Sequence, residues 1–412
     1  MPSSTLVMVL VDLVIIMIAA RALGRLAEKL GQPRVIGEIT AGILAGPTIL
    51  GPHLSNLLFP ADVRPMLSVL ANLGVIAFMF IAGLEVDRGV LTGRRAVVPT
   101  ISAAAYAVPF ALGCLIAVVA LSRHHTGTDT VAFALFIGCS LAVTAFPVLA
   151  RILVDRDLIR TRVGQLSLAC AAVIDVLAWI ALAAVLVLVA PTGSYWRWAL
   201  LIPIAAIMWW GVRPLMAKFA ATSTPQQVVL LALGSALLLG ALTEWIGLHV
   251  IFGGFAAGLC FPRAQRAAAE SGANVLSTLL LPAFFVVAGL SVDLGMIDTT
   301  GVGELVIIVL AAVGGKIGSV MLACRLTGLD TRTSAALAAL LNTRGLTELV
   351  ILHIGLTAGL IGTGLYSLLV VMALVTTAMT EPLLRWIKVP RTVTHDMNTA
   401  GRRGMVVKAA AD

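Results

Sequence analysis

Thirteen long apolar runs, separated by short polar segments, make up most of this chain. A helix that crosses a bilayer needs about 20 mostly apolar residues, because its backbone polar groups must all be satisfied within the helix. The pattern therefore predicts an all-α polytopic membrane protein with about 13 transmembrane helices. The runs lie near residues 5–23, 35–50, 66–84, 96–121, 131–154, 165–190, 196–212, 227–245, 249–262, 274–292, 303–325, 332–356 and 362–386.

The composition agrees with a membrane protein and excludes several other classes. Of the 412 residues, 60% are apolar and 12% are charged, whereas soluble domains average about 45–50% and about 25%. A cytosolic enzyme, a disordered protein and a secreted disulfide scaffold are therefore excluded. The five cysteines stand singly in apolar runs, so we expect neither a disulfide nor a metal site. The net charge of +8 comes without a basic stripe with interleaved aromatic residues, so we expect no nucleic-acid partner.

Lysine and arginine fall almost entirely on one set of alternate loops. Of the 28 residues, 23 lie on that side, three (Arg64, Arg123 and Arg197) lie opposite, and Lys316 and Arg344 lie inside runs. Because these residues accumulate in cytoplasmic loops, we expect the N-terminus outside and the C-terminus in the cytoplasm, in the plasma or inner membrane. The first run has no basic residue before it and contains Asp12, so we treat it as a span and not as a cleavable signal.

Two segments recur in the second half of the chain. The segment FMFIAGLEVD (78–87) matches FFVVAGLSVD (284–293) at six of ten positions, and VIGEITAGI (35–43) matches IFGGFAAGL (251–259) more weakly. These matches equate spans two and three with spans nine and ten. A shift of seven helices inverts the second copy, so we predict inverted six-helix repeats, 1–6 and 8–13, with a linker helix 7 at 196–212. Inverted repeats are typical of secondary transporters with a site at the membrane midplane; chance similarity among Ala-, Gly- and Leu-rich helices is the alternative.

Three charged residues lie inside predicted spans, where each costs about 2.5–3.5 kcal/mol at a helix centre. Asp175, near the middle of span six, is the candidate site for which a cation and a proton compete. Lys316, flanked by glycines in span eleven, is a candidate counter-charge for that carboxylate or for the ends of broken helices. Arg344 lies four residues before Glu348, so a local ion pair is expected there and not a second ion site. The alternative for Asp175 and Lys316 is a purely structural ion pair.

Spans five and twelve occupy equivalent positions in the two repeats, and both contain a poor helical stretch. Their centres, 140–153 and 339–352, align with Thr144 over Thr343. Interrupted helices at matching positions indicate a transporter site, since their N-termini are positive and their freed carbonyl groups can coordinate a cation. The residues assigned to the breaks are Pro147 in span five, which lacks a backbone donor, and Asn342, Thr343 and Gly345 in span twelve. For span five alone, a simple proline kink is the alternative.

Several of these segments resemble the monovalent cation:proton antiporters of the second cation/proton antiporter family. The similar segments are 32–47, 80–87, 140–153, the sequence around Asp175, 314–318 and 342–349. They occur in the family's order between about residues 5 and 386. The resemblance implies a fold with crossed broken helices 5 and 12, a homodimer, and a core domain that moves against a dimerisation panel. It also implies that Asp175 is the ion-binding carboxylate and Lys316 the core lysine.

One residue departs from the family pattern. The family usually has Asp, Asn or Gln before the essential aspartate, whereas this chain has Ile174. We therefore expect Lys316 to face Asp175 itself, with Thr144 and backbone carbonyl groups completing the cation site.

The resemblance also gives an expected division of the chain. Residues 1–390 form the exchanger domain, with a panel of 5–62 and 227–272, a core of 63–190 and 273–386, and the linker at 196–212. Residues 391–412 form a short cytoplasmic tail, and we expect no large cytoplasmic regulatory domain.

Together these features predict a secondary active transporter that exchanges Na⁺ or K⁺ for H⁺ by alternating access around Asp175. A single titrating site predicts electroneutral exchange. The alternatives are a proton-coupled carrier for an organic cation or metabolite, a passive cation channel of the same fold, and a sensor that does not transport. No nucleotide-binding loop, zinc motif or nucleophile–histidine arrangement is present, so the sequence gives no support to an enzyme or to a cofactor. The expected partners are monovalent cations, protons, the lipid bilayer and a second copy of the chain.

Overall fold

The computed structural model describes residues 3–60, 62–85, 97–125, 127, 129–158, 161–189, 206–246 and 249–387. Within these ranges, nine helical segments are long and apolar enough to cross a membrane. They are α1 (Ser3–Lys29), α4 (Arg64–Glu85), α5 (Val97–Val119), α8 (Arg162–Val189), α12 (Pro225–Ile246), α14 (Arg266–Leu290), α15 (Thr299–Leu326), the pair α16 (Thr331–Leu341) and α17 (Leu346–Thr357), and α18 (Thr363–Ile387). The prediction of an all-helical polytopic membrane protein is confirmed.

Shorter helices account for most of the remaining predicted spans. Span two is α2 (Arg34–Ala45), span five is α6 (Thr130–Ala142) with α7 (Phe146–Asp155), and span nine is α13 (Val250–Cys260). Of the seventh predicted span, 196–212, only residues 206–212 are described, and they include the π-helical turn η3 (Ile207–Val212). The expected tail, 391–412, lies outside the described residues.

Two helices were not predicted. Helix α3 (Pro47–Leu58) begins directly after α2 ends, at the pair Gly46–Pro47, because proline suits the first turn of a helix. Helix α11 (Arg213–Thr222) connects η3 to α12. Short 3₁₀ turns complete the loops: η2 (Ser122–His124), η4 (Arg263–Gln265) and η5 (Leu294–Met296).

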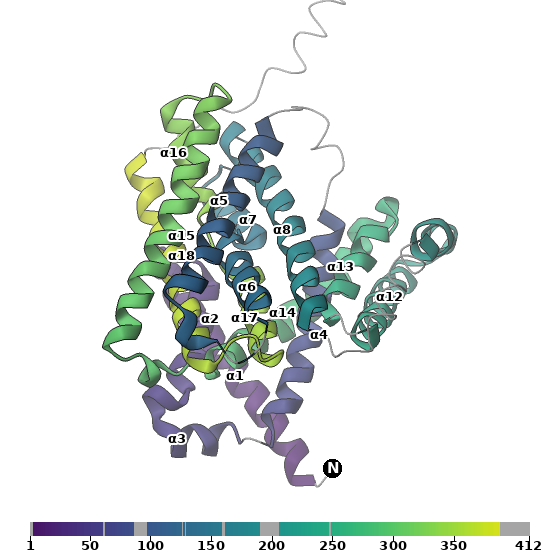
Figure 1. Cartoon of the computed structure of the whole chain (residues 1–412). Coiled ribbons are helices and arrows are strands. Elements are labelled where there is room, and N and C mark those ends of the chain that lie inside the picture. The colour runs from purple at the N-terminus through teal and green to yellow at the C-terminus, as the bar shows by residue number, and fades with distance from the viewer. Residues whose placement is uncertain are drawn as a thin grey trace, which may run out of the picture.

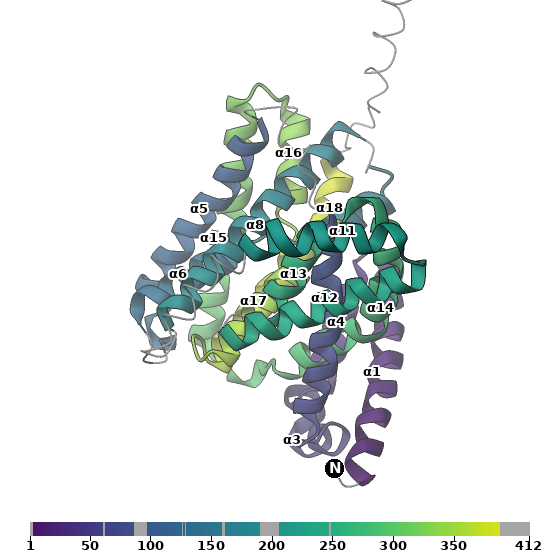
Figure 2. The ribbon, with the colours of Figure 1, turned by 90° about the vertical axis from the view of Figure 1, so that its right-hand side faces the viewer.

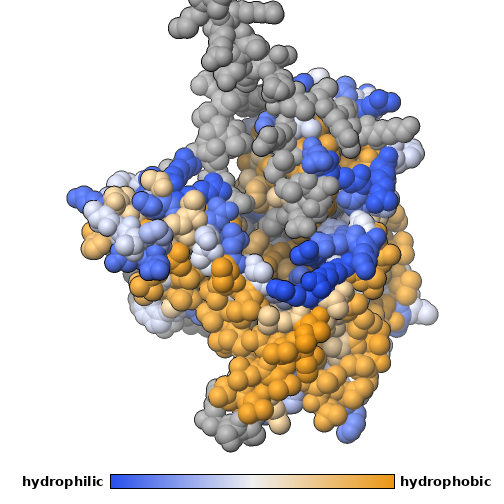
Figure 3. Space-filling model, turned by 180° about the vertical axis from the view of Figure 1, so that it is seen from behind, coloured by the Kyte–Doolittle hydropathy of each residue, from blue (hydrophilic) through white to orange (hydrophobic). Residues whose placement is uncertain are grey.

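Large apolar side chains cover much of the outer surface. Figure 3 shows them as a broad hydrophobic area below a hydrophilic edge. Several helices contribute strongly exposed leucines, among them Leu6 and Leu10 of α1, Leu230 and Leu238 of α12, and Leu310 of α15. Soluble monomers rarely expose such extensive apolar surface, so this surface fits contact with lipid.

The helices pack in two groups. In the first group α4 packs most extensively on α13 and α14, α2 packs on α1 and α14, and α12 packs on α13. In the second group α5 packs on α6, α8 and α15, and α16 packs on α15 and α18. Figure 2 shows α5, α6 and α15 on one side of the molecule and α1 and α14 on the other, with α12 crossing in front of α4. Figure 1 shows α15, α16 and α18 on the side opposite α12.

Close glycine contacts occur at matching places in the two halves of the chain. A Cβ atom at Gly42 of α2 would meet the backbone of Gly289 in α14, and one at Gly258 of α13 would meet the backbone of Gly83 in α4. The sequence matches equate Gly42 with Gly258 and Gly83 with Gly289. Each of these two equivalent contacts therefore joins a helix from the first half of the chain to a helix from the second half.

A second pair of equivalent glycine contacts lies within the halves, one contact in each half. Gly37 of α2 lies against the backbone of Gly24 in α1, and Gly253 of α13 lies against the backbone of Gly240 in α12. Gly24 and Gly240 are separated by the same 216 residues as Gly37 and Gly253. The packing of α1 on α2 is thus repeated by the packing of α12 on α13, at the same spacing as the sequence match.

Candidate functional site

The two interrupted spans meet at their breaks. Helix α6 ends at Ala142 and α7 begins at Phe146, while α16 ends at Leu341 and α17 begins at Leu346. The backbone N–H of Ala145 donates to the carbonyl oxygen of Thr343 at 3.0 Å. The hydroxyl group of Thr144 donates to the carbonyl oxygen of Leu341 at 2.8 Å. Each break therefore satisfies backbone groups that the other leaves free.

The structure places the residues assigned to span twelve in its break, but places Pro147 just beyond the break of span five. Asn342, Thr343 and Gly345 fall between α16 and α17, and Gly345 is the N-cap of α17. Pro147 lies in the first turn of α7, after the break, where its missing N–H removes no helical hydrogen bond. The interruption itself occupies residues 143–145.

Two buried cations cover the C-terminal end of α6. The ammonium group of Lys316 donates to the carbonyl oxygen of Ala105 at 3.0 Å and to that of Ala142. The guanidinium group of Arg344 donates to the carbonyl oxygens of Ser140 at 2.8 Å and Leu141 at 2.6 Å. The last carbonyl groups of a helix are unpaired and carry partial negative charge, so both cations compensate the broken helix end.

Arg344 also forms the predicted local ion pair. Its guanidinium group lies 3.0 Å from the carboxylate of Glu348, and both side chains are fully buried. Helix α18 supports the same break, since the Thr377 hydroxyl group accepts from the backbone N–H of Arg344 at 3.0 Å and donates to its carbonyl oxygen at 2.6 Å. The hydroxyl groups of Thr343 and Thr380 lie 3.3 Å apart.

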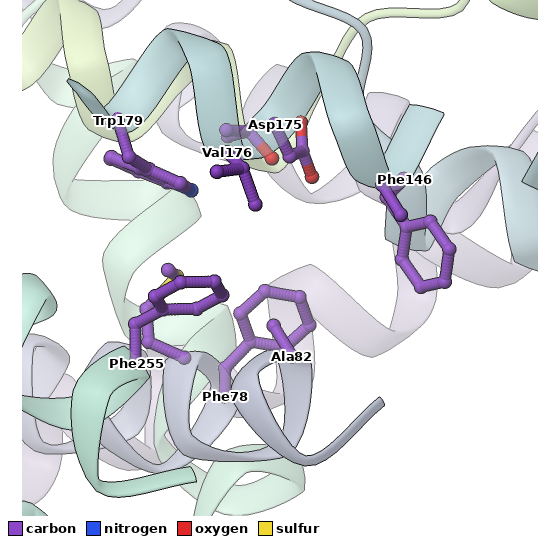
Figure 4. A pocket seen from close by; sticks show the side chains of 10 residues that line it. Phe78, Ala82, Phe146, Asp175, Val176, Trp179 and Phe255 are labelled. Carbon is purple, nitrogen blue, oxygen red and sulfur yellow. The ribbon is translucent and has the colours of Figure 1, made fainter. Parts of the chain in front are cut away.

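Asp175 of α8 lines a cavity between the two groups of helices (Figure 4). The cavity is small, with a volume of about 20 Å³ for the centre of a water-sized particle. Asp175 is the only charged residue among its described lining residues. The full lining consists of Phe78, Met79 and Ala82 of α4, Phe255 of α13, Phe146 of α7, Ala172, Asp175, Val176 and Trp179 of α8, and Thr347 of α17.

Two neighbouring groups partly compensate the charge of the Asp175 carboxylate. The backbone N–H of Phe146, at the positive N-terminus of α7, and the side chain of Thr347 interact with the carboxylate. One carboxylate oxygen, Oδ1, is buried and has no hydrogen-bond partner. A free, buried acceptor in a cavity is suited to hold a proton or a cation.

The expected direct pairing of Lys316 with Asp175 is not found. The two residues interact electrostatically, but the ion pairs among the described residues do not include one between them. The Lys316 ammonium group instead donates to the carbonyl oxygens of Ala105 and Ala142. Ile174 is fully buried and does not line the cavity, so the departure at this position does not alter the cavity wall.

The threonine assignment also differs from the structure. Thr144, the expected ligand, is fully buried and does not line the cavity. Thr347, which we did not select from the sequence, supplies the hydroxyl group near Asp175. A signal was present, because Thr347 directly follows the helix break and lies in the first turn of α17. The described residues contain no cluster of three or more His, Cys, Asp or Glu side chains that could hold a metal ion.

Sequence comparison gives matches along nearly the whole chain. Residues 13–386 match the family model described as sodium/hydrogen exchanger, transmembrane. The chain is 36% identical over 401 residues to the Na⁺/H⁺ antiporter NhaS4 of Synechocystis sp., covering 93% of this chain and 98% of that protein. It is 33% identical to the K⁺/H⁺ antiporter 1 of Saccharomyces cerevisiae, covering 92% of this chain but 46% of the yeast protein.

The fold is also found among solved structures. The sodium proton antiporter MjNhaP1 of Methanocaldococcus jannaschii superimposes with a TM-score of 0.70 at 16% identity, covering 93% of this chain and 98% of that one. This likeness establishes the fold, and the family match establishes a multi-pass membrane transporter and not an enzyme. The chain belongs to the sodium/hydrogen exchanger family.

Proposed function

We propose that this protein is a monovalent cation/proton antiporter that exchanges Na⁺ or K⁺ for H⁺ through Asp175. The observation that carries the proposal is the buried carboxylate with a free oxygen, placed in a cavity where two broken helices meet. Relatives named as Na⁺/H⁺ and K⁺/H⁺ antiporters support the class of substrate.

In this mechanism the Asp175 carboxylate holds either a proton or a cation. The N-terminus of α7 and the Thr347 side chain orient the carboxylate, and Thr347 offers an oxygen ligand to the bound cation. Lys316, Arg344 and Glu348 hold the broken helices in place and do not exchange ions. Because one carboxylate alternates between two monovalent ions, exchange is one-for-one and electroneutral.

Alternating access requires that two bodies move about the site. We assign α5–α8 and α15–α18 to the core, and α1, α2, α4 and α12–α14 to the panel. The sequence division placed span three and span ten, α4 and α14, in the core. Their packing on α13, α2 and α12 favours the panel instead. With this division the cavity wall comes from both bodies, as a gated site requires.

The finer topology belongs to the same proposal. Equivalent glycine contacts in α1–α2 and α12–α13 support inverted repeats joined by a seventh linker helix, thirteen spans in all. The segregation of Lys and Arg supports an external N-terminus and a cytoplasmic C-terminus in the cell membrane. We also propose that two copies of the chain form a homodimer.

Exchange by proteoliposomes that enclose a fluorescent pH indicator tests the proposal. Wild-type protein should release protons when Na⁺ or K⁺ is added, without generating a membrane potential. Asp175→Asn should abolish this release, because the amide cannot alternate between a proton and a cation. Asp12→Asn, which alters a buried carboxyl group of α1 away from the cavity, is the matched control and should retain exchange. Full activity of Asp175→Asn would refute the site.

A further inference from the structure

Aromatic rings dominate the wall of the Asp175 cavity. Four of its ten lining residues are aromatic, and only Asp175 and Thr347 offer side-chain oxygen atoms. We call Phe78, Phe146, Trp179 and Phe255 the aromatic wall. Figure 4 shows Phe78 and Phe255 across the cavity from Asp175.

The aromatic wall is divided between the two groups of helices. Phe78 and Phe255 come from α4 and α13, whereas Phe146 and Trp179 come from α7 and α8, beside the carboxylate. The ring of Trp179 is held edge-to-face by Phe252 at 5.8 Å between centroids. A cation bound to Asp175 therefore has the carboxylate on one side and the rings of Phe78 and Phe255 across the cavity.

Such a lining discriminates between cations by the cost of removing their water. Small alkali ions hold water tightly and need a nearly complete shell of oxygen ligands to replace it. Aromatic rings attract a cation by about 0.5–2 kcal/mol, most effectively when the cation is desolvated. A site with two side-chain oxygen donors and four rings thus suits an ion that loses its water readily.

We propose that the aromatic wall selects weakly hydrated monovalent cations, so that K⁺ is preferred to Na⁺ among the physiological alkali ions. The same chemistry admits a small alkylammonium ion, for which aromatic cages are a common binding site. This inference rests on the proposed exchange function and specifies its substrate class.

The test compares apparent affinities for several cations in the proteoliposome assay. The wild-type protein should respond in the order Cs⁺ and Rb⁺, then K⁺, then Na⁺, then Li⁺. Phe78→Leu and Phe255→Leu should each lower the K⁺/Na⁺ affinity ratio by about 2- to 10-fold, because a lost ring weakens binding of the desolvated ion. Phe110→Leu, which removes a ring stacked on Tyr106 and outside the cavity, is the matched control and should leave the ratio unchanged.

The possible results separate this inference from the proposed function. Proton exchange that favours Na⁺ or Li⁺, or an unchanged ratio in both cavity variants, overturns the inference and leaves the function standing. Absence of proton release with every cation overturns the function itself. Proton-coupled exchange driven by methylammonium, with the same loss in Phe78→Leu, supports the inference and identifies an organic cation as a substrate; exchange by alkali ions alone supports it for K⁺.

Discussion

Buried charges in this protein are balanced by helix ends as well as by each other. Lys316 and Arg344 share the last three carbonyl groups of α6, and Glu348 neutralises Arg344. Asp175 instead lies near the N-terminus of α7 and keeps one oxygen free. The cationic side chains are thus committed to structure, whereas Asp175 keeps an oxygen available for an ion at the cavity.

Thr347→Val tests whether the hydroxyl group near Asp175 acts as a ligand. The substitution keeps the shape and removes an oxygen, so the apparent cation affinity should fall by about 3- to 10-fold, the equivalent of one ordinary hydrogen bond. Thr144→Val is the matched control, because its hydroxyl group bonds to Leu341 and not to the cavity. It should lower thermal stability and leave the affinity unchanged. Equal affinity losses in both variants would contradict the assignment of Thr347.

The Arg344–Glu348 pair should behave as a structural unit. Arg344→Leu leaves a buried carboxylate and two carbonyl groups unpaired, so the free energy of unfolding should fall by about 3–5 kcal/mol. Glu348→Leu alone should also destabilise. The double variant should recover part of the loss, because no unpaired charge remains. Thermal unfolding in detergent measures this cycle, and strictly additive losses would show that the two side chains do not interact.

At the scale of the helices, close approach depends on glycine. Gly258 of α13 lies against the backbone of α4, so a Cβ atom there would meet the carbonyl oxygen of Phe80. Backbone atoms cannot move aside as a flexible side chain can.

Gly258→Ala should therefore separate α13 from α4 and lower stability by about 1–3 kcal/mol. Gly234→Ala in α12 is the matched control, since a Cβ atom at that position meets nothing, and it should be neutral or stabilising because alanine favours helix. Thermal unfolding of both variants provides the measurement. A Gly258→Ala protein as stable as Gly234→Ala would show that the contact is looser than described.

Helix α16 depends on a charged cap outside the membrane span. The Asp330 carboxylate accepts from the backbone N–H of Thr333 at 3.0 Å, and the hydrogen bonds from Thr333 hold the pKa of Asp330 below its usual value. A carboxyl group with a lowered pKa stabilises the fold fully above its unfolded-state pKa of about 4, and this contribution is lost as the pH falls through the folded-state pKa.

Asp330→Ala should accordingly lower the free energy of unfolding by about 1 kcal/mol at neutral pH. The difference from the wild type should shrink as the pH falls below about 4, because the carboxylate is protonated first in the unfolded state and only at lower pH in the folded state. Thermal unfolding in detergent at pH 7, 5 and 3.5 checks this, and Asp330→Asn, an uncharged cap, should show less dependence on pH. A difference that stays constant over this range would contradict the charged cap.

At the scale of the whole molecule, the proposed mechanism requires the two groups of helices to move. Gln32, between α1 and α2, donates from its side-chain amide to the carbonyl oxygen of Ala378 in α18 at 3.4 Å. This contact joins the proposed panel to the proposed core. A covalent link at this point should therefore hold one conformation.

In a background lacking the five native cysteines, a disulfide between Gln32→Cys and Ala378→Cys should stop exchange, and a reductant should restore it. A disulfide between Arg123→Cys and Asp298→Cys is the control, because these residues pair at 3.2 Å within the proposed core. It should leave exchange intact. Normal exchange by the Gln32–Ala378 cross-linked protein would mean that the bodies do not separate at this contact.

The sequence by itself determined the membrane class, most of the spans, the presence of a break in spans five and twelve, and the Arg344–Glu348 pair. These properties depend on local sequence: the length of an apolar run, a stretch of poor helix formers, and a spacing of four residues on one helix face. Asp175, Lys316 and Arg344 were identified for the same reason, because a charged residue inside an apolar run is visible in the sequence alone.

Only the tertiary structure decided what those charges contact. Lys316 lies 141 residues after Asp175 in the chain, and no local pattern reveals that its ammonium group binds Ala105 and Ala142 instead. The same holds for the aromatic wall, whose rings come from four helices. A buried polar group bonds to the backbone and side-chain atoms that lie near it in the fold. Because the packing of distant helices brings these atoms together, the partners are defined only when the chain has folded.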